Sequence, residues 1–145
     1  MIAILLKKGH FLCIDFIYLA VLFVLRVALF PSASVDDAEQ LIYAQTWAWG
    51  HKANKPLLFT WLVILSKYLF GVSVFAVEAV KFVYLFLLYG FLSFASYLIV
   101  KDRLYSMLCG LSLVGIYHVG WDVLMNYSNT ALMGAAVAAS FWALF

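Results

Sequence analysis

The chain has 145 residues, of which 68% are hydrophobic and only 11% are charged, and its formal net charge is +2. A soluble domain carries roughly a quarter charged residues and keeps a large share of its surface in water, so this composition excludes a soluble globular fold. Because the charge is small and forms no basic stripe, we expect no nucleic-acid partner and predict an integral membrane protein built from hydrophobic helices.

The first apolar run covers residues 11–30 and follows Lys7 and Lys8. It is longer than the roughly 7–15-residue core of a signal peptide and long enough to span the hydrocarbon region of a bilayer. Short cytoplasmic segments collect Lys and Arg, so the two lysines place the N-terminus in the cytoplasm. The run is therefore predicted to be an uncleaved transmembrane helix that leads outward.

A polar stretch follows, and its first residues predict a helix outside the membrane. Ser34 can cap this helix, and Asp37 stands three residues later, as in a capping box with Asp in place of the usual Glu. The helix is expected to run to Gly50, a residue type that commonly ends helices. Residues spaced i, i+3, i+4 and i+7 share one helix face. Here they are Asp36, Glu39, Gln40 and Tyr43.

The paired carboxylates of Asp36 and Asp37 allow two interpretations. Acidic residues in a first turn stabilise the positive end of a helix dipole, which is a purely structural role. An ionised carboxylate can also serve as a general base or a metal ligand. Anionic lipid repels carboxylates beside a bilayer, so capping alone explains them poorly.

The end of this external stretch carries a basic residue and several tryptophans. Lys55 precedes Pro56, which suits the first position of a helix, and a helix N-terminus attracts anions. Snorkelling at the interface is the alternative role for this lysine. Trp47, Trp49 and Trp61 suit the headgroup level of a bilayer.

The run Leu57–Phe70 is predicted to lie at the membrane interface rather than to cross the membrane. It includes Lys67 and is short, which is typical of interfacial segments. The basic turn at 101–103 should be cytoplasmic like the N-terminus, so an even number of crossings must separate them. With 11–30 and Val74–Val100 as those crossings, the short run stays outside.

Two further runs, 104–119 and 131–145, are expected to lead outward and back, with an external loop at about 120–130. The last run has no polar flank at a membrane exit, so we expect the chain to be part of a longer protein. The prediction is an all-α fold of about four transmembrane helices, with juxtamembrane helices in the first external loop.

Several sequence blocks occur in a fixed order. They are Asp36-Asp37-Ala38-Glu39-Gln40-Leu41, then Tyr43-Ala44 and Gly50, then Lys55-Pro56-Leu57-Leu58 with Trp61-Leu62, then Leu69-Phe70-Gly71-Val72-Ser73-Val74-Phe75-Ala76-Val77, and finally Gly120-Trp121-Asp122 through Ser128-Asn129-Thr130-Ala131-Leu132. Together they resemble the dolichyl-phosphate-mannose-protein mannosyltransferase-like family, which are family 39 glycosyltransferases of the GT-C fold. The resemblance implies that residues 1–145 are the N-terminal part of a GT-C transmembrane domain.

The resemblance also implies an activity and a location. The family transfers a sugar from a polyprenyl-phosphate donor to a lipid, glycan or protein acceptor. The implied location is the bacterial inner membrane, where a multi-pass enzyme has its active face on the external, periplasmic side. Membrane lipid and the lipid-phosphate sugar donor are the implied partners. No cofactor is certain, and a divalent metal stays an open alternative.

By position, the resemblance implies catalytic roles for Asp36 and Asp37, with Asp36 as the general base or a metal ligand. Lys55 takes the position that meets the donor phosphate, where a cation neutralises developing charge. The other implied substrate-binding residues are Glu39, Tyr43, Asp122, Asn126 and Asn129. The family pattern has an acidic residue or a histidine near positions 126 and 129, whereas this chain has amides.

A second hypothesis is a non-enzymatic multi-spanning membrane protein, such as a piece of a transporter or an assembly subunit. Ionisable residues inside apolar runs favour it, because such residues are usually functional. They are Asp15, Arg26, Glu78 and Lys81. However, the sequence has no internal repeat of the kind transporters often show, and its carboxylates gather in an external stretch. The enzyme is therefore the leading hypothesis.

Overall fold

The computed structural model describes residues 10–30, 32–49, 56–126 and 128–144, and these residues form helices without any strand. This confirms the predicted all-α class. In chain order the elements are α2 (His10–Leu29), α3 (Val35–Tyr43), α4 (Leu57–Phe70), α5 (Val74–Val100), α6 (Arg103–Leu111), a 3-10 turn η1 (Ser112–Gly115), a π-helical turn η2 (His118–Asp122), α7 (Val123–Met125) and α8 (Ser128–Ala143).

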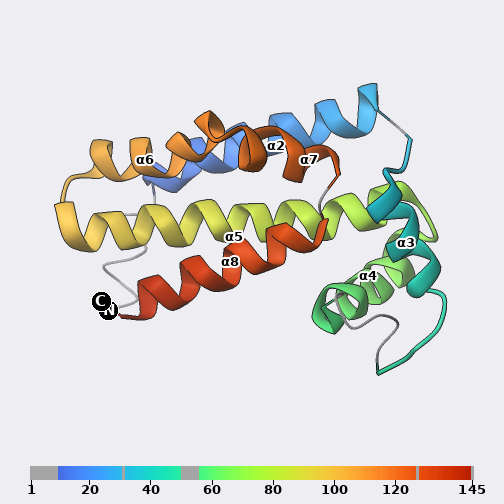
Figure 1. The fold of residues 1–145 in the computed structure, drawn as a ribbon. Helices are drawn as coiled ribbons and strands as arrows, with labels where there is room; N and C mark the ends of the chain where they lie inside the picture. Colours follow the sequence, from blue (N-terminus) through green and yellow to red (C-terminus); the bar gives the residue numbers. More distant parts are fainter. Residues whose placement is uncertain (1–9, 31, 50–55, 127, 145) are drawn as a thin grey trace.

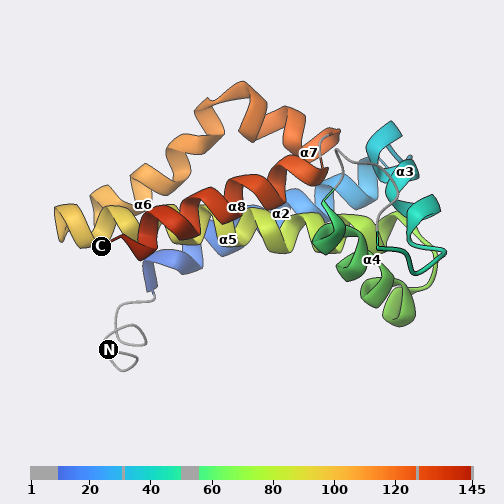
Figure 2. The same ribbon diagram turned by 60° about the horizontal axis from the view of Figure 1, so that its bottom comes forward.

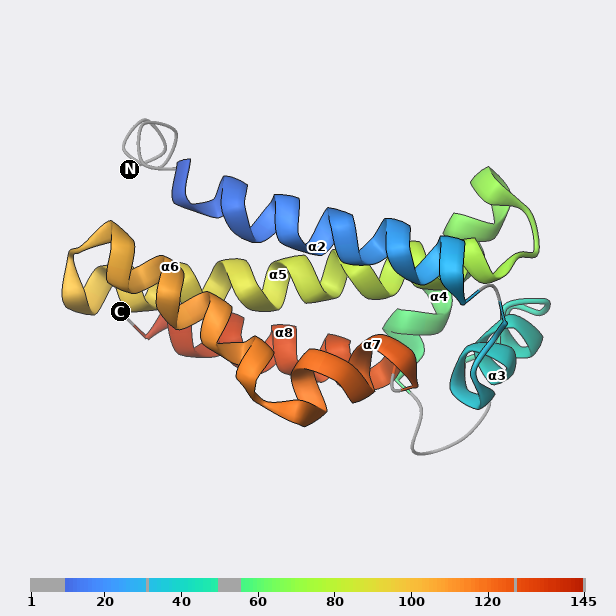
Figure 3. The same cartoon turned by 90° about the horizontal axis from the view of Figure 1, so that it is seen from above.

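The longest helix, α5, forms the centre of the molecule, and α2, α6 and α8 lie along it (Figures 1 and 3). Helices α3 and α4 gather at one end of α5, beside the end of α2, as Figure 2 also shows. The turn between α5 and α6, at 101–103, lies at the opposite end. The acidic helix and the basic turn are therefore separated by the length of the bundle.

Helix α5 begins and ends where local signals predict. The hydroxyl of Ser73 accepts a hydrogen bond from the backbone N–H of Ala76 at 3.3 Å, which caps the first turn. Lys101 ends the helix in the left-handed conformation, with φ of 58°. In the described part of the chain, Val74–Val100 is the one helix long and apolar enough on its own to cross a membrane, and a bent pair would add a second. The expected number of about four is not confirmed.

The bent pair contains the run 104–119, which we expected to cross the membrane as a helix, and the structure breaks this run into two parts. Helix α6 ends at Leu111, and the two parts, Arg103–Gly115 and His118–Met125, meet at 79°. At the bend the backbone carbonyl of Val114 lies so close to Gly120 that a Cβ atom there would clash with it. Glycine thus permits this close approach of two backbone segments.

The prediction of a loop at about 120–130 is wrong, because η2 and α7 continue to Met125 and α8 begins at Ser128. In the segment that we expected to be external, α4 has the predicted bounds. Helix α3, by contrast, ends at Tyr43 instead of Gly50, which lies outside the described residues. The carbonyl of Ala44 accepts a hydrogen bond from Lys67 Nζ of α4 at 2.7 Å, and lysine at a helix end satisfies such free carbonyls.

The hydrophobic core surrounds α5, with buried side chains from α2, α4, α7 and α8, and aromatic pairs join α2 and α4 to α5. Phe59 of α4 stacks on Tyr84 of α5, with ring centroids 5.9 Å apart. Phe23 of α2 meets Phe82 of α5 edge to face at 5.1 Å. Such pairs add to the free energy gained by burying the rings. They fix α4 and the end of α2 on the first half of α5, where the candidate site lies.

Candidate functional site at the acidic end of the bundle

Helix α3 begins with the predicted capping box. The Ser34 hydroxyl accepts a hydrogen bond from the Asp37 backbone N–H at 3.2 Å, and Asp37 Oδ2 accepts one from the Ser34 backbone N–H at 3.4 Å. The Ser34 hydroxyl also donates to Asp37 Oδ2 at 2.7 Å. These bonds satisfy two donors that a helix start leaves free. They also hold the Asp37 side chain toward the start of the helix.

The Asp37 carboxylate belongs to a group of four charged side chains, Arg26, Asp37, Glu78 and Lys81, which we call the charge cluster. Arg26 Nη2 of α2 lies 3.0 Å from Glu78 Oε1 and 3.7 Å from Asp37 Oδ2. Lys81 Nζ of α5 lies 3.1 Å from Glu78 Oε1 and 3.2 Å from Asp37 Oδ1. Each carboxylate therefore contacts both cations, and the formal charges of the cluster sum to zero.

All members of the cluster are buried, with side chains at most 4% exposed. Removing one partner of such a buried group leaves an uncompensated charge, which strongly destabilises a fold. Both cations also bind carbonyls: Lys81 Nζ donates to Leu124 O at 3.3 Å, and Arg26 donates to Phe30 O. The cluster thus joins α2, α3, α5 and α7.

Not every polar atom of the cluster is satisfied. Arg26 Nε and Glu78 Oε2 are buried and have no hydrogen-bond partner among the described residues. An unpaired buried polar atom costs free energy, since water can no longer hydrogen-bond to it. The ion pairs thus join α3 to α2 and α5 while these two atoms stay unsatisfied.

A second chain of hydrogen bonds joins two segments that the family resemblance singles out. Gln40 is buried on the same face of α3 as Asp37. Its side-chain N–H donates to Asn129 Oδ1 of α8 at 3.1 Å, and its oxygen accepts from Thr60 Oγ1 of α4 at 2.9 Å. Asn129 thus lies beside the acidic helix, as expected if both segments form one site.

The other predicted site residues lie in different settings. Asp36, Glu39 and Tyr43 are half-buried on α3. Asp122 pairs with His118, with Oδ2 and Nδ1 3.4 Å apart, and Asn126 is exposed at the end of α7. Among the predicted residues, Lys55 lies outside the described part of the chain.

The two catalytic candidates therefore differ. Asp37 is 0% exposed and contacts two cations, so the structure gives it a positioning role. Asp36 keeps part of its surface at the outside of the same helix turn. Of the pair, Asp36 can reach a substrate without breaking the charge cluster.

The charge cluster does not fit a divalent cation. Its carboxylates are already neutralised by Arg26 and Lys81, and a cation placed between them would meet two positive charges. Across the described residues no three side chains of His, Cys, Asp or Glu come together as a metal site would require. We therefore derive no chemical step through a metal.

In comparisons with known proteins, no family model matches the chain, and no curated protein or solved structure is similar to it. The resemblance to the mannosyltransferase-like family therefore rests on the sequence blocks alone. The geometry adds independent facts: an acidic helix at one end of a helical bundle, held by buried ion pairs, with an acidic residue on its outer side.

Proposed function

We propose that this chain belongs to a multi-pass membrane glycosyltransferase of the bacterial inner membrane. It would transfer a sugar from a polyprenyl-phosphate donor to a lipid, glycan or protein acceptor on the external face. One observation carries this proposal: a helix that begins with two carboxylates is fixed at the end of the bundle farthest from the basic turn at 101–103. An end of this kind offers partly exposed carboxylates beside the bilayer surface.

The membrane part of the proposal is supported by apolar side chains that face outward along the bundle. Phe16 and Ile17 of α2 are 58% and 60% exposed, and Val83 of α5 is 57% exposed. Water would disfavour so much apolar surface, whereas lipid chains accept it. We propose four crossings: α2, α5, the bent run from α6 to α7, and α8.

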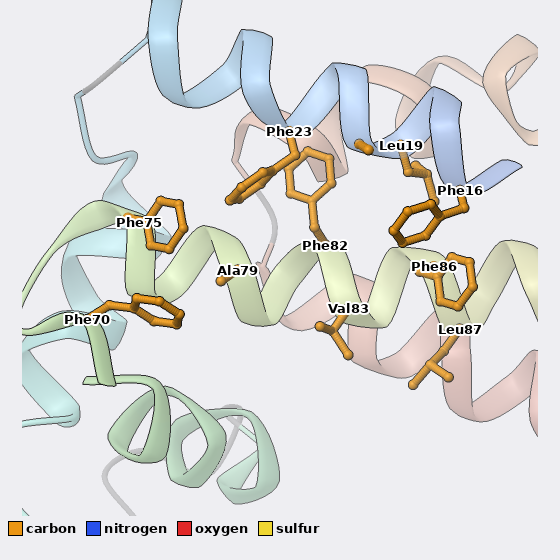
Figure 4. A pocket seen from close by; sticks show the side chains of 11 residues that line it. Phe16, Leu19, Phe23, Phe70, Phe75, Ala79, Phe82, Val83, Phe86 and Leu87 are labelled. Carbon is orange, nitrogen blue, oxygen red and sulfur yellow. The ribbon is translucent and has the colours of Figure 1, made fainter. Parts of the chain in front are cut away.

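An apolar pocket supports a lipid-linked donor. It has a volume of about 330 Å³ and lies between α2 and α5, with Phe70 and Phe75 at one end (Figure 4). Aromatic and aliphatic side chains line it, so it suits a hydrocarbon chain better than a polar ligand. We assign it to the polyprenyl chain of the donor, whose phosphate would then lie toward the end where α3 is fixed.

In the proposed reaction Asp36 acts as the general base. It takes the proton from an acceptor hydroxyl while that oxygen forms a bond to the anomeric carbon of the sugar. The bond from the anomeric carbon to the phosphate oxygen breaks, and polyprenyl phosphate leaves with the electron pair. Lys55 would neutralise the leaving phosphate. Glu39 and Tyr43, which lie on α3 like Asp36, would bind the acceptor.

The non-enzymatic alternative has one observation in its favour. The four charges of the charge cluster balance one another and are buried, which is also how a purely structural network is built. A transporter or assembly subunit could use the cluster only to hold its helices together. The glycosyltransferase needs the half-buried carboxylate of Asp36 as a general base, whereas the non-enzymatic protein does not.

The test is Asp36→Asn in the protein expressed from its complete reading frame. Asparagine keeps the size of the side chain and leaves the Ser34–Asp37 capping box in place, but it cannot act as a base, so we expect a loss of about 10²–10⁴ in transfer rate. Transfer is measured with labelled polyprenyl-phosphate donors that carry a hexose or a pentose. Asp102→Asn is the matched control, since Asp102 caps α6 at the other end of the bundle. Unchanged transfer in Asp36→Asn would contradict the assignment.

A further inference from the structure

A second hollow at the acidic end is lined by Trp47, Ala48, Trp49 and Trp61, and we call it the tryptophan pocket. It has a volume of about 200 Å³. The segment that follows α3 supplies the first three residues, and the second turn of α4 supplies Trp61. Nothing in the proposed sugar transfer uses this pocket.

The indole rings stand at different angles around the pocket. The ring of Trp61 lies 6.2 Å from that of Trp47, with an angle of 44° between the planes. It lies 5.7 Å from the ring of Trp49, with an angle of 82°. Trp61 Nε1 donates to Ala48 O at 3.4 Å, which holds the segment against α4. The arrangement is thus a folded aromatic site, not three independent side chains.

Two of these rings are largely uncovered by the rest of the protein. Trp47 is 66% exposed and Trp49 is 87% exposed, although indole is among the largest apolar surfaces a residue can bury. Neighbouring exposed aromatic side chains mark surfaces that bind a ligand, a partner or a membrane. Because a pocket lies between these rings, a ligand with a group that can enter the pocket is favoured over a flat partner surface.

The lining defines the chemistry of that group. The described residues of the lining supply three aromatic rings and no charged side chain, and the N–H of Trp61 is already used by Ala48. A sugar ring would need several hydrogen-bonding groups, which this lining offers poorly. A quaternary ammonium group carries positive charge but no N–H, so it needs aromatic faces and no acceptor. The pocket is also smaller than the roughly 300–1,000 Å³ of pockets for drug-sized ligands, which suits one compact group.

We propose that the tryptophan pocket binds a quaternary ammonium group, such as the trimethylammonium of a choline-type lipid headgroup. The same α4 helix exposes Tyr68, Leu69 and Phe70, apolar side chains that would face the bilayer. Tryptophan and tyrosine concentrate at the headgroup level, so a lipid headgroup is within reach of the pocket. The site would hold α3 and α4 at the membrane surface.

The first test uses tetramethylammonium chloride as the probe, with ammonium chloride at equal ionic strength as the reference. The methyl proton signal of the probe should shift upfield and saturate, since the indole faces shield a bound group. In the double variant Trp47→Leu with Trp49→Leu, affinity should fall at least about tenfold. Trp121→Leu is the matched control, because Trp121 is 50% exposed on η2, outside the pocket, and its loss should change nothing.

A second experiment distinguishes a lipid headgroup from a soluble quaternary ammonium compound as the ligand of the pocket. The protein is placed in bilayer discs of phosphatidylcholine or of phosphatidylglycerol, and tetramethylammonium binding is repeated. Competition by phosphatidylcholine alone supports the headgroup as ligand, whereas equal binding in both discs supports a soluble quaternary ammonium compound.

Three results would overturn the proposal: no saturable shift, the same affinity for ammonium, or equal losses in the double variant and in Trp121→Leu. Circular dichroism in detergent controls for folding of each variant. If the double variant unfolds, Trp49→Leu alone replaces it, since that ring is almost fully exposed. An unchanged affinity in the folded single variant would then count against the pocket.

Discussion

The molecule buries ionisable side chains in two regions, and these side chains have different partners in each region. At the acidic end, Arg26, Asp37, Glu78 and Lys81 balance one another through contacts of 3.0–3.7 Å. Along the bundle, Asp15 of α2 is 0% exposed, and Oδ2 accepts a hydrogen bond from the Ser93 hydroxyl of α5 at 3.0 Å. Asp15 Oδ1 has no partner among the described residues.

The two regions hold their helices together in different ways. The charge cluster joins segments through charge balance, so it depends on having every member present. The Asp15 site joins α2 and α5 through a single hydrogen bond, and its neighbour on α6 is Gly110. Because glycine has no side chain, α6 can approach closely, as small residues allow in packed membrane helices. One region therefore depends on charge, and the other on shape.

The largest effect should come from removing one cation of the charge cluster. In Lys81→Met, Asp37 and Glu78 would share only Arg26, and the loss of free energy of unfolding should be about 3–5 kcal/mol. Helix α3 should also become accessible to protease within 32–49. Stability is measured by denaturant titration in detergent micelles, and accessibility by limited proteolysis.

The double variant Glu78→Gln with Lys81→Met is the control for charge balance. It removes one charge of each sign and leaves Arg26 with Asp37, so it should destabilise less than Lys81→Met alone. A double variant that is less stable than Lys81→Met would show that size, not charge, governs the cluster.

A smaller effect should follow from crowding the Asp15 site. A Cβ atom on Gly110 would clash with the Ser93 hydroxyl and approach Asp15 Oδ2 to 3.3 Å. Gly110→Ala must therefore displace Ser93, and we expect a loss of about 1–3 kcal/mol, as for other overpacked sites. Ser93→Ala in the same chain should restore part of this stability, because it removes the clashing atom. Additive losses in the double variant would refute the shape argument.

Local signals made part of the fold predictable. The bounds of α4 and α5 follow from Pro56, Gly71 and Ser73, which act within a few residues of the helix ends. The end of α3 could not be predicted, because Lys67 of another helix binds the carbonyl of Ala44. The bend after α6 likewise depends on a contact between Val114 and Gly120 that composition does not reveal.

The candidate site was predictable to a similar degree. The capping box at Ser34 is local, and the sequence predicts it. The buried face of α3 is formed by Asp37 and Gln40, whereas the sequence interpretation grouped Gln40 with Asp36, because only the packing decides which face turns inward. The charge cluster was missed, although Arg26, Glu78 and Lys81 inside apolar runs are a signal for mutual pairing.

In the proposed topology the two ends of the bundle lie on opposite sides of a membrane. Single cysteines at Thr46, after α3, and at Asp102, before α6, test this in a chain whose Cys13 and Cys109 are serine. A membrane-impermeant maleimide is added to intact cells and then to opened cells. We predict that position 46 reacts in intact cells, whereas position 102 reacts only after opening. Labelling of both positions from the same side would contradict the account.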